Sequence, residues 1–248
     1  MKPTISIVTV TLNAAKDLPG LISSMRNQTD LEFDYVVIDG ASKDGTRDII
    51  ASAGDIVTYT ISEPDRGFFD ALNKAIRAVK TDFYIVMGAD DRFEPDAIAN
   101  FKSVVEKTEA DVVIADVKAG KTIRRGYHPE RRWLGPAQMI TSHSVGTYMR
   151  TNLHSKFGDY SWRYPLLADI HYVKRLCLSP EVKVVAGNFL SGEFAMDGFS
   201  NNNFARILCE YWWVQRDTGE NPLLQYLLFQ LRALRYLPRV ISSLGEAR

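Results

Sequence analysis

Short apolar runs separated by helical stretches dominate the first part of the chain. Runs rich in branched and aromatic residues predict buried strands at 5–10, 33–39, 56–61 and 83–87. Between these runs, apolar residues recur every three or four positions, which predicts helices over 18–25, 47–53 and 69–79. Regular alternation of strand and helix is typical of an α/β fold, in which helices flank a mostly parallel central sheet.

Carboxylates follow the predicted strands. Asp39 ends the second strand, Asp65 follows the third, and Asp90 and Asp91 follow the fourth. Because the carboxyl ends of parallel strands meet at one edge of the sheet, where ligands bind, these four acids are expected to converge on one crevice. Adjacent carboxylates repel each other, and a bound cation is one reason to keep both. Turn or helix-capping roles remain the alternative for each acid.

The second half of the chain has a less regular pattern. It predicts a helix over 96–106, a strand over 111–117, a turn at 119–121, and closing strands over 182–186 and 189–194. The segment 121–133 is basic, and is either a contact for an anionic group or a solvated surface loop. Asp169 opens a further helix with an apolar stripe, where the helix dipole favours a carboxylate.

The C-terminal segment predicts an amphipathic helix. Asn221 and Pro222 form an N-cap and first helical residue, and leucines follow at 224, 227, 228, 231 and 234. Arginines at 232, 235 and 239 are the only charges from Pro222 to Leu244. Residues 211–240 therefore either lie on a membrane surface, or pack on the domain or against a second copy in a homodimer.

Composition sets limits on the function. The 248 residues are 46% hydrophobic and 24% charged, which is ordinary for a globular protein, and the net charge is zero. Zero net charge removes any global argument for nucleic-acid binding. The N-terminal apolar run is too short for a signal peptide, and no uncharged run has the length of a membrane span. A cytoplasmic location is expected, with peripheral contact at the inner face of the cytoplasmic membrane as an extension of it.

Four ordered motifs resemble glycosyltransferase family 2, whose members are inverting enzymes with the GT-A (Rossmann-like) nucleotide-sugar fold. The motifs are Ser6–Asn13, Val36–Thr46, Ser62–Ile76 and Gly88–Asp91. The resemblance is strong over residues 4–100 and traceable to about residue 200. It implies a donor-binding half (1–118), an acceptor-side half with the catalytic base (119–202) and amphipathic C-terminal helices (203–248). Without spanning helices or a Gln-x-x-Arg-Trp motif, the chain resembles the non-processive bacterial members.

The resemblance also implies roles for individual residues. Implied nucleotide contacts are Thr11, Asn13, Asp39, Asp65, Arg66, Asn73 and Asp90. Asp90 and Asp91 stand for the Asp-x-Asp motif that holds Mn or Mg, and these hard cations prefer oxygen ligands such as carboxylates. His143 is implied as a further contact to the metal or a phosphate. Many members carry an aspartate where this chain has Gly88. The sequence therefore does not determine which of Asp90 and Asp91 makes the main metal contact. Asp169 matches the position of the catalytic base.

The implied reaction moves a sugar from a nucleotide-diphosphate sugar, usually a UDP-sugar, to a hydroxyl of a glycan or lipid-linked acceptor in surface polysaccharide assembly. Two other functions stay open. A sugar-nucleotide nucleotidyltransferase is disfavoured, because Thr11–Lys16 lacks the glycines of a phosphate loop. A catalytically silent, membrane-associated subunit of a glycan assembly complex is disfavoured by Asp90, Asp91 and Asp169, although Gly88 leaves some room for it.

Overall fold

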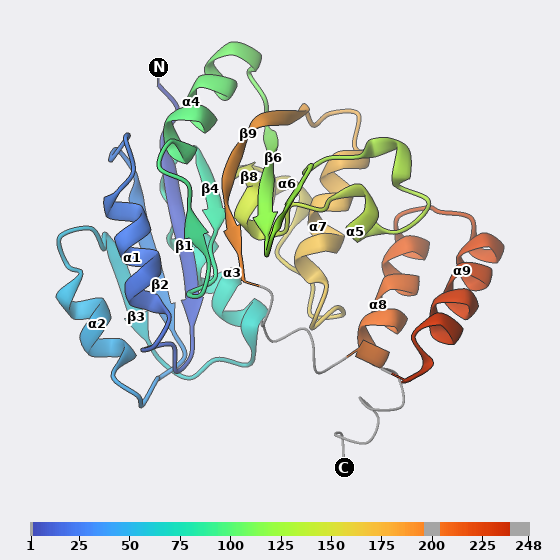
Figure 1. Cartoon of the computed structure of the whole chain (residues 1–248), viewed down its shortest axis with the longest axis horizontal. Helices are drawn as coiled ribbons and strands as arrows, with labels where there is room; N and C mark the ends of the chain where they lie inside the picture. The colour runs from blue at the N-terminus through green and yellow to red at the C-terminus, as the bar shows by residue number, and fades with distance from the viewer. Residues whose placement is uncertain (1, 196–203, 239–248) are drawn as a thin grey trace.

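The computed structural model describes residues 2–195 and 204–238 (Figure 1). The strands are β1 Ile5–Thr11, β2 Asp34–Asp39, β3 Tyr59–Ser62, β4 Phe83–Val86, β5 Arg92–Phe93, β6 Val112–Ala119, β7 Thr122–Arg124, β8 Thr147–Arg150 and β9 Val184–Phe194. The α-helices are α1 Leu18–Arg26, α2 Thr46–Ser52, α3 Phe68–Ala78, α4 Ala97–Thr108, α5 Pro136–Met139, α6 Leu153–Phe157, α7 Ala168–Leu178, α8 Phe204–Asp217 and α9 Pro222–Arg235. Short 3₁₀ turns occupy Pro129–Arg131 and Ser144–Gly146.

One twisted sheet runs through the described residues, in the order β3-β2-β1-β4-β8-β6-β9-β5, with β7 paired to β6. The first four strands are parallel, as the sequence predicted. Beyond them the sheet is mixed, because β8 runs antiparallel to both of its neighbours, β4 and β6. The prediction of a mainly parallel sheet is therefore confirmed for β1 to β4 and for the β6–β9 pair, whereas the other pairs are antiparallel.

Two strand predictions need correction. Residues 56 and 57 do not begin β3, because their amides bond back to the Ala53 carbonyl at 3.0 Å and continue the turn after α2. One long strand, β9, replaces the two predicted closing strands. Its pairing with β6 shifts register around Asp116, and this irregularity lets the chain continue where a break was expected.

Alternating strand residues build a core on each face of the sheet. In β1, Ile5 and Ile7 pack with helices α1, α2 and α4, whereas Val8 packs with α3, α6 and α7. The large buried ring of Tyr84 belongs to the second layer, and Phe83 to the first. This double cover explains why the parallel strands read as continuous apolar runs.

Helices α8 and α9 pack against each other at the end of the molecule away from β3 (Figure 1). The predicted cap of α9 is confirmed, since the Asn221 side-chain oxygen accepts from the backbone N–H groups of Leu223 and Leu224 at 3.0 and 3.1 Å. Within residues 2–195 and 204–238, no helix has both the length and the apolar composition needed to cross a membrane.

Candidate functional site

Two adjoining cavities open where β1 and β4 end. The first, here called the acidic chamber, has a volume of about 400 Å³ and is lined by residues that include Thr11, Asn13, Asp17, Asp90 and Asp91. The second, here called the apolar chamber, has a volume of about 660 Å³, and its lining includes Leu72, Ile140, Met149, Val173, Tyr211 and Tyr236. Both volumes are in the range of small-molecule sites. Phe68, Val86, His143, Ser144 and Asp169 line both chambers.

The carboxylates of Asp90 and Asp91 close over Gly88. The Gly88 N–H donates to Asp91 Oδ2 at 2.9 Å, and the Ala195 N–H donates to Asp91 Oδ1 at 3.0 Å. A Cβ on residue 88 would lie 2.7 Å from Asp90 Oδ1 and 2.8 Å from Asp91 Oδ2. The glycine that departs from the common family pattern is therefore the residue that makes room for the two carboxylates in this arrangement.

The buried Asp91 carboxyl is poised between its two protonation states. Burial raises its pKa to about 7, the Ala195 N–H opposes that shift, and the neighbouring charge of Asp90 adds to it. Two oxygens that meet over Gly88 form a hard donor set suited to Mg or Mn, and a divalent cation would relieve their repulsion. The described residues contain no group of three His, Cys, Asp or Glu placed to hold a metal, so oxygens from a ligand would complete the shell.

His143 lies at the boundary between the chambers with a strained backbone, at φ 50°. Its ring stacks on Phe194, with the ring centroids 3.8 Å apart. Although the side chain is exposed at the cavity surface, the surrounding protein lowers its pKa to about 4, and the positive charge of Arg124 contributes. The imidazole is therefore neutral at neutral pH, as a metal ligand must be.

Asp169 lies in the first turn of α7, as predicted, and its carboxyl faces both chambers. Burial raises its pKa to about 6, backbone N–H groups of Ile170 and of Asp169 itself oppose the shift, and the charge of Glu210 adds to it. A carboxylate with a pKa near neutrality at the junction of two cavities is suited to accept a proton.

Glu210 of α8 is a site residue that sequence reasoning missed. Its buried Oε2 accepts from the backbone N–H groups of Leu166 and Leu167, both at 3.0 Å, directly before α7. Arg206 contacts the other oxygen at 3.0 Å. Glu210 thereby fixes the backbone that presents Asp169. No local motif marks it, because the contact depends on how α8 folds back onto the start of α7.

Thr11 and Asn13 line the acidic chamber at the end of β1. Among the described atoms, the buried Thr11 hydroxyl has no hydrogen-bond partner. Asn13, at φ 52°, donates its backbone N–H to Ser42 at 2.8 Å and accepts from the Lys43 N–H at 3.0 Å. The β1 end is thus braced by the loop after β2, and the Thr11 hydroxyl is buried beside it.

Asp39 and Asp65 do not join the acid pair in the described chamber linings, so the expected convergence of four acids is found only in part. Asp39 is fully buried and accepts from the Ser62 hydroxyl at 2.6 Å and from the Ser42 backbone N–H at 3.0 Å, with the Ser42 hydroxyl as a further donor. Asp65 pairs with Lys74 at 2.6 Å. The Asp39 carboxylate is buried at the end of β2 and bonds to nearby serines. The Asp65 carboxylate is held by Lys74.

Two other predicted nucleotide contacts have structural partners. The buried Asn73 amide donates to the Tyr160 carbonyl at 3.0 Å and accepts from the Tyr160 N–H at 2.9 Å. Asn73 therefore lies outside the described chamber linings, because its amide is used to fix the loop before α7. The backbone N–H of Arg66 donates to Asp70 at 2.9 Å, which ties the start of α3 to its own first turn.

The sheet order and the carboxylate pair after β4 define the GT-A class of nucleotide-sugar fold. The chain belongs to Glycosyl transferase family 2, whose profile matches residues 6–169. It is 28% identical over 193 residues to a PGL/p-HBAD biosynthesis glycosyltransferase of Mycobacterium bovis, covering 72% of this chain and 71% of that protein. It is 30% identical over 202 residues to an uncharacterized glycosyltransferase of Mycoplasma pneumoniae, covering 75% and 68% of the two chains.

Solved structures share the fold. TarS residues 1–349 of S. aureus, in complex with UDP, align with a TM-score of 0.66 and 13% identity over 95% of this chain and 72% of that chain. The mannosyltransferase PcManGT of Pyrobaculum calidifontis, in complex with GDP-Man and Mn²⁺, aligns with a TM-score of 0.67 and 17% identity over 100% and 75%. At these identities the similarity establishes the fold alone.

Proposed function

We propose that this glycosyltransferase moves a sugar from a nucleotide-diphosphate sugar, most simply a UDP-sugar, to an acceptor hydroxyl with inversion at the anomeric carbon. The observation that carries the proposal is the position of Asp169 at the junction of the acidic and apolar chambers. In this proposal residues 1–118 bind the donor and residues 119–202 supply the acceptor side and the base.

The donor is proposed to occupy the acidic chamber. Thr11 and Asn13 line this chamber and are proposed to contact the donor. Asp65 and Arg66 are proposed to contact the base and phosphates from the end of β3, and the buried Asp39 is proposed to hold the neighbouring loop through Ser42. Support for Asp65 comes from its closeness to the end of β1, since a Cβ on Gly40 would lie 3.2 Å from its Oδ2 and 3.5 Å from the Thr11 carbonyl.

Asp90 and Asp91 are proposed to hold Mg or Mn against the donor diphosphate, with Asp90 also near the nucleotide. When bound, such a cation offsets the negative charge that develops on the leaving diphosphate. The neutral imidazole of His143 is proposed as a further contact to the metal or a phosphate. Support comes from the carboxylate arrangement over Gly88 and from the Mn²⁺ and GDP-Man bound by the structurally similar mannosyltransferase.

Asp169 is proposed as the general base. Its carboxylate takes the proton of the acceptor hydroxyl, whose oxygen forms the new bond to the anomeric carbon while the bond to the diphosphate oxygen breaks. Attack from the apolar chamber, opposite the leaving group in the acidic chamber, inverts the configuration. A pKa of about 6 leaves Asp169 ionised at neutral pH and still basic enough to accept a proton.

The acceptor is proposed to be a glycan or lipid-linked molecule, reached through peripheral contact of residues 211–240 with the cytoplasmic membrane. The apolar chamber supports an amphiphilic acceptor, since aliphatic and aromatic side chains from α3, α5, α7 and α8 make up much of its lining. A homodimer through the same C-terminal helices is the competing arrangement.

Calorimetric titration with UDP and GDP, with and without Mn, tests the donor site. We expect metal-dependent binding by the wild type and a loss of about a hundredfold or more in the Asp91→Ala variant, because a cation ligand is removed. The affinity of Asp91→Ala for the nucleotides measured without Mn should differ little from that of the wild type. Absence of binding to either nucleotide, with or without Mn, would overturn the transferase proposal and favour a catalytically silent subunit.

A further inference from the structure

Helix α9 presents its faces in the reverse of the usual order. Gln225 is 1% exposed, whereas Leu227 is 60% and Leu231 is 63% exposed. A surface helix of a globular protein normally turns its leucines toward the core and its polar residues toward water. The exposed apolar residues, here called the leucine face, surround the exposed Gln230 and are Leu223, Tyr226, Leu227, Leu231, Leu234 and Leu237.

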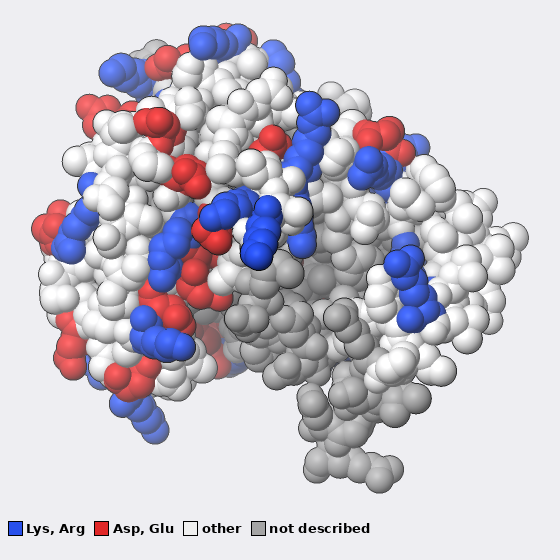
Figure 2. Space-filling model, in the orientation of Figure 1, with Lys and Arg blue, Asp and Glu red and all other residues white. Residues whose placement is uncertain are grey.

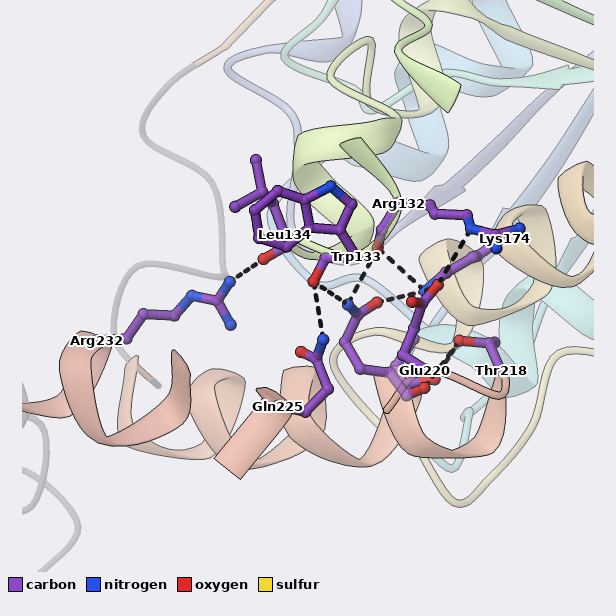
Figure 3. A network of polar contacts seen from close by, with 10 residues as sticks. Arg132, Trp133, Leu134, Lys174, Thr218, Glu220, Gln225 and Arg232 are labelled. Atoms are coloured by element: carbon purple, nitrogen blue, oxygen red, sulfur yellow. Dashed lines mark hydrogen bonds and ion pairs between the residues drawn. The ribbon is translucent and has the colours of Figure 1, made fainter. Parts of the chain in front are cut away.

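The inward polar face of α9 fixes this orientation (Figure 3). Gln225 donates to the Trp133 carbonyl at 2.8 Å, and the Arg232 guanidinium donates to the Leu134 carbonyl. These carbonyls belong to the irregular segment just before α5, so they have no partners in regular secondary structure. Turning the leucines inward would remove the Arg232 donor from the Leu134 carbonyl and one of two donors from the Trp133 carbonyl, and losing such partners is costly for backbone groups.

The same segment is held from two other helices. Gln215 of α8 donates to the carbonyls of Arg132 and Trp133 at 3.1 and 3.2 Å, and the fully buried Lys174 of α7 donates to that of Arg132 at 3.4 Å. Since α5 follows directly and lines the apolar chamber, α9 and the chamber wall form one connected unit (Figure 3).

We propose that the leucine face docks on a lipid surface and holds the apolar chamber there, so that an acceptor anchored in the lipid reaches Asp169. This inference rests on the proposed function for the acceptor and for the membrane contact of residues 211–240, and it names the surface that makes that contact. The C-terminal end of α9 reaches the chamber, because its C-cap residue Tyr236 lines the chamber together with Tyr211 of α8.

Charge favours lipid over a second copy of the chain. From 221 to 238 the charged residues are Arg232 and Arg235, with no acid, and Arg235 is exposed. A two-fold dimer through this face would bring together two copies of a helix that carries the exposed Arg235 and no acid to pair with it, whereas lipid phosphates would neutralise the charge. The right-hand end of the molecule, where α9 lies, is mainly uncharged in Figure 2, while the opposite end mixes both signs.

Both C-terminal helices carry exposed aromatic residues. Trp213 of α8 is 40% exposed, and the Arg216 guanidinium lies 5.7 Å from the centroid of its ring. Tyr226 belongs to the leucine face itself. Tryptophan, tyrosine and arginine are typical of the boundary between lipid headgroups and acyl chains.

Co-sedimentation with vesicles tests the proposal, using phosphatidylcholine alone and phosphatidylcholine mixed with phosphatidylglycerol. We expect the full-length protein to bind, more tightly to the mixed vesicles, and a Leu227→Gln/Leu231→Gln variant to lose about tenfold or more of its affinity. The matched control is Leu31→Gln/Ile123→Gln, which changes two residues with 61% and 66% exposure outside the face and should bind like the wild type.

Three outcomes would overturn the docking proposal. These are no binding of the wild type to the mixed vesicles, equal binding by the leucine-face variant, and equal losses in the matched control. Light scattering adds a fourth, a wild-type dimer that the leucine-face substitutions convert to a monomer, which would identify a second copy as the occupant. UDP titration with Mn on the same variants should be unchanged, and separates failure of docking from failure of the donor site.

Discussion

The acidic and apolar chambers meet at Asp169 but are built in different ways. The acidic chamber consists largely of strand ends and the short loops after β1 and β4, so neighbours in sequence are neighbours in space. The apolar chamber gathers side chains from α3, α5, α7, α8 and β8, which lie far apart in the sequence. The acidic chamber is therefore shaped mainly by the backbone after β1 and β4, with distant braces from Ser42 and Ala195, and the apolar chamber by how helices pack and how α9 holds the segment before α5.

If the acidic chamber depends on local geometry, one added methyl group should damage it. We expect Gly88→Ala to lower Mn-dependent affinity for UDP by about tenfold or more, because its Cβ displaces the Asp90 and Asp91 oxygens that now lie within 3 Å of that position. Calorimetry with and without Mn measures the effect. Gly54→Ala, whose Cβ would meet only a backbone oxygen at 3.3 Å, is the control. If the affinity of Gly88→Ala for UDP depended on Mn as in the wild type, Asp90 and Asp91 would not be the metal ligands.

A variant of Glu210, which holds the backbone before Asp169, should lower turnover and leave donor affinity unchanged. We expect Glu210→Ala to lower the rate of donor cleavage by about tenfold, because the N–H groups of Leu166 and Leu167 lose their acceptor and the start of α7 loosens. UDP affinity should stay unchanged. Glu210→Gln retains an acceptor oxygen and should recover most of the rate, with the acidic limb of the pH profile moved to lower pH. Equal losses of rate and UDP affinity would indicate a general structural role instead.

The smallest expected effect concerns pH and stability. Burial holds the pKa of Asp91 at about 7, whereas an unfolded aspartate titrates near about 3.9. Between these values the folded state keeps a proton that the unfolded state has lost, so the stability from this group falls as pH rises through about 7. Relative to Asp91→Asn, the metal-free wild type should lose a few degrees of Tm between about pH 5 and 8.

Adding Mn at the upper end of that range should restore the wild-type Tm and leave Asp91→Asn nearly unchanged, because a cation stabilises only the ionised carboxylate pair. Parallel pH slopes for the two metal-free proteins would contradict the assigned burial of the Asp91 charge.

The sequence was sufficient for the elements whose partners are close in the chain. The β1 to β4 strands, the acid pair after β4 and the Asn221 cap all follow from local pattern. Contacts between distant segments could not be predicted this way. Asn73 is bonded to Tyr160, 87 residues away, so a residue in a family motif serves the loop before α7.

Helix α9 shows the same limit. Leucine spacing predicted the helix but not which face is buried, because that depends on the carbonyls of Trp133 and Leu134, 92 and 98 residues from their partners Gln225 and Arg232. Periodicity reports an apolar face, and only the packed structure reports whether that face points inward.

The position of Asp169 between the two chambers is tested most directly by Asp169→Asn, which keeps the shape and removes the base. The measurement pairs UDP release from a UDP-sugar that the wild type cleaves with calorimetric UDP affinity in the presence of Mn. We predict that the rate falls by about a hundredfold or more while the affinity for UDP stays within about twofold of the wild type. A variant that turns over at the wild-type rate would contradict the assignment of Asp169 as the base at this junction.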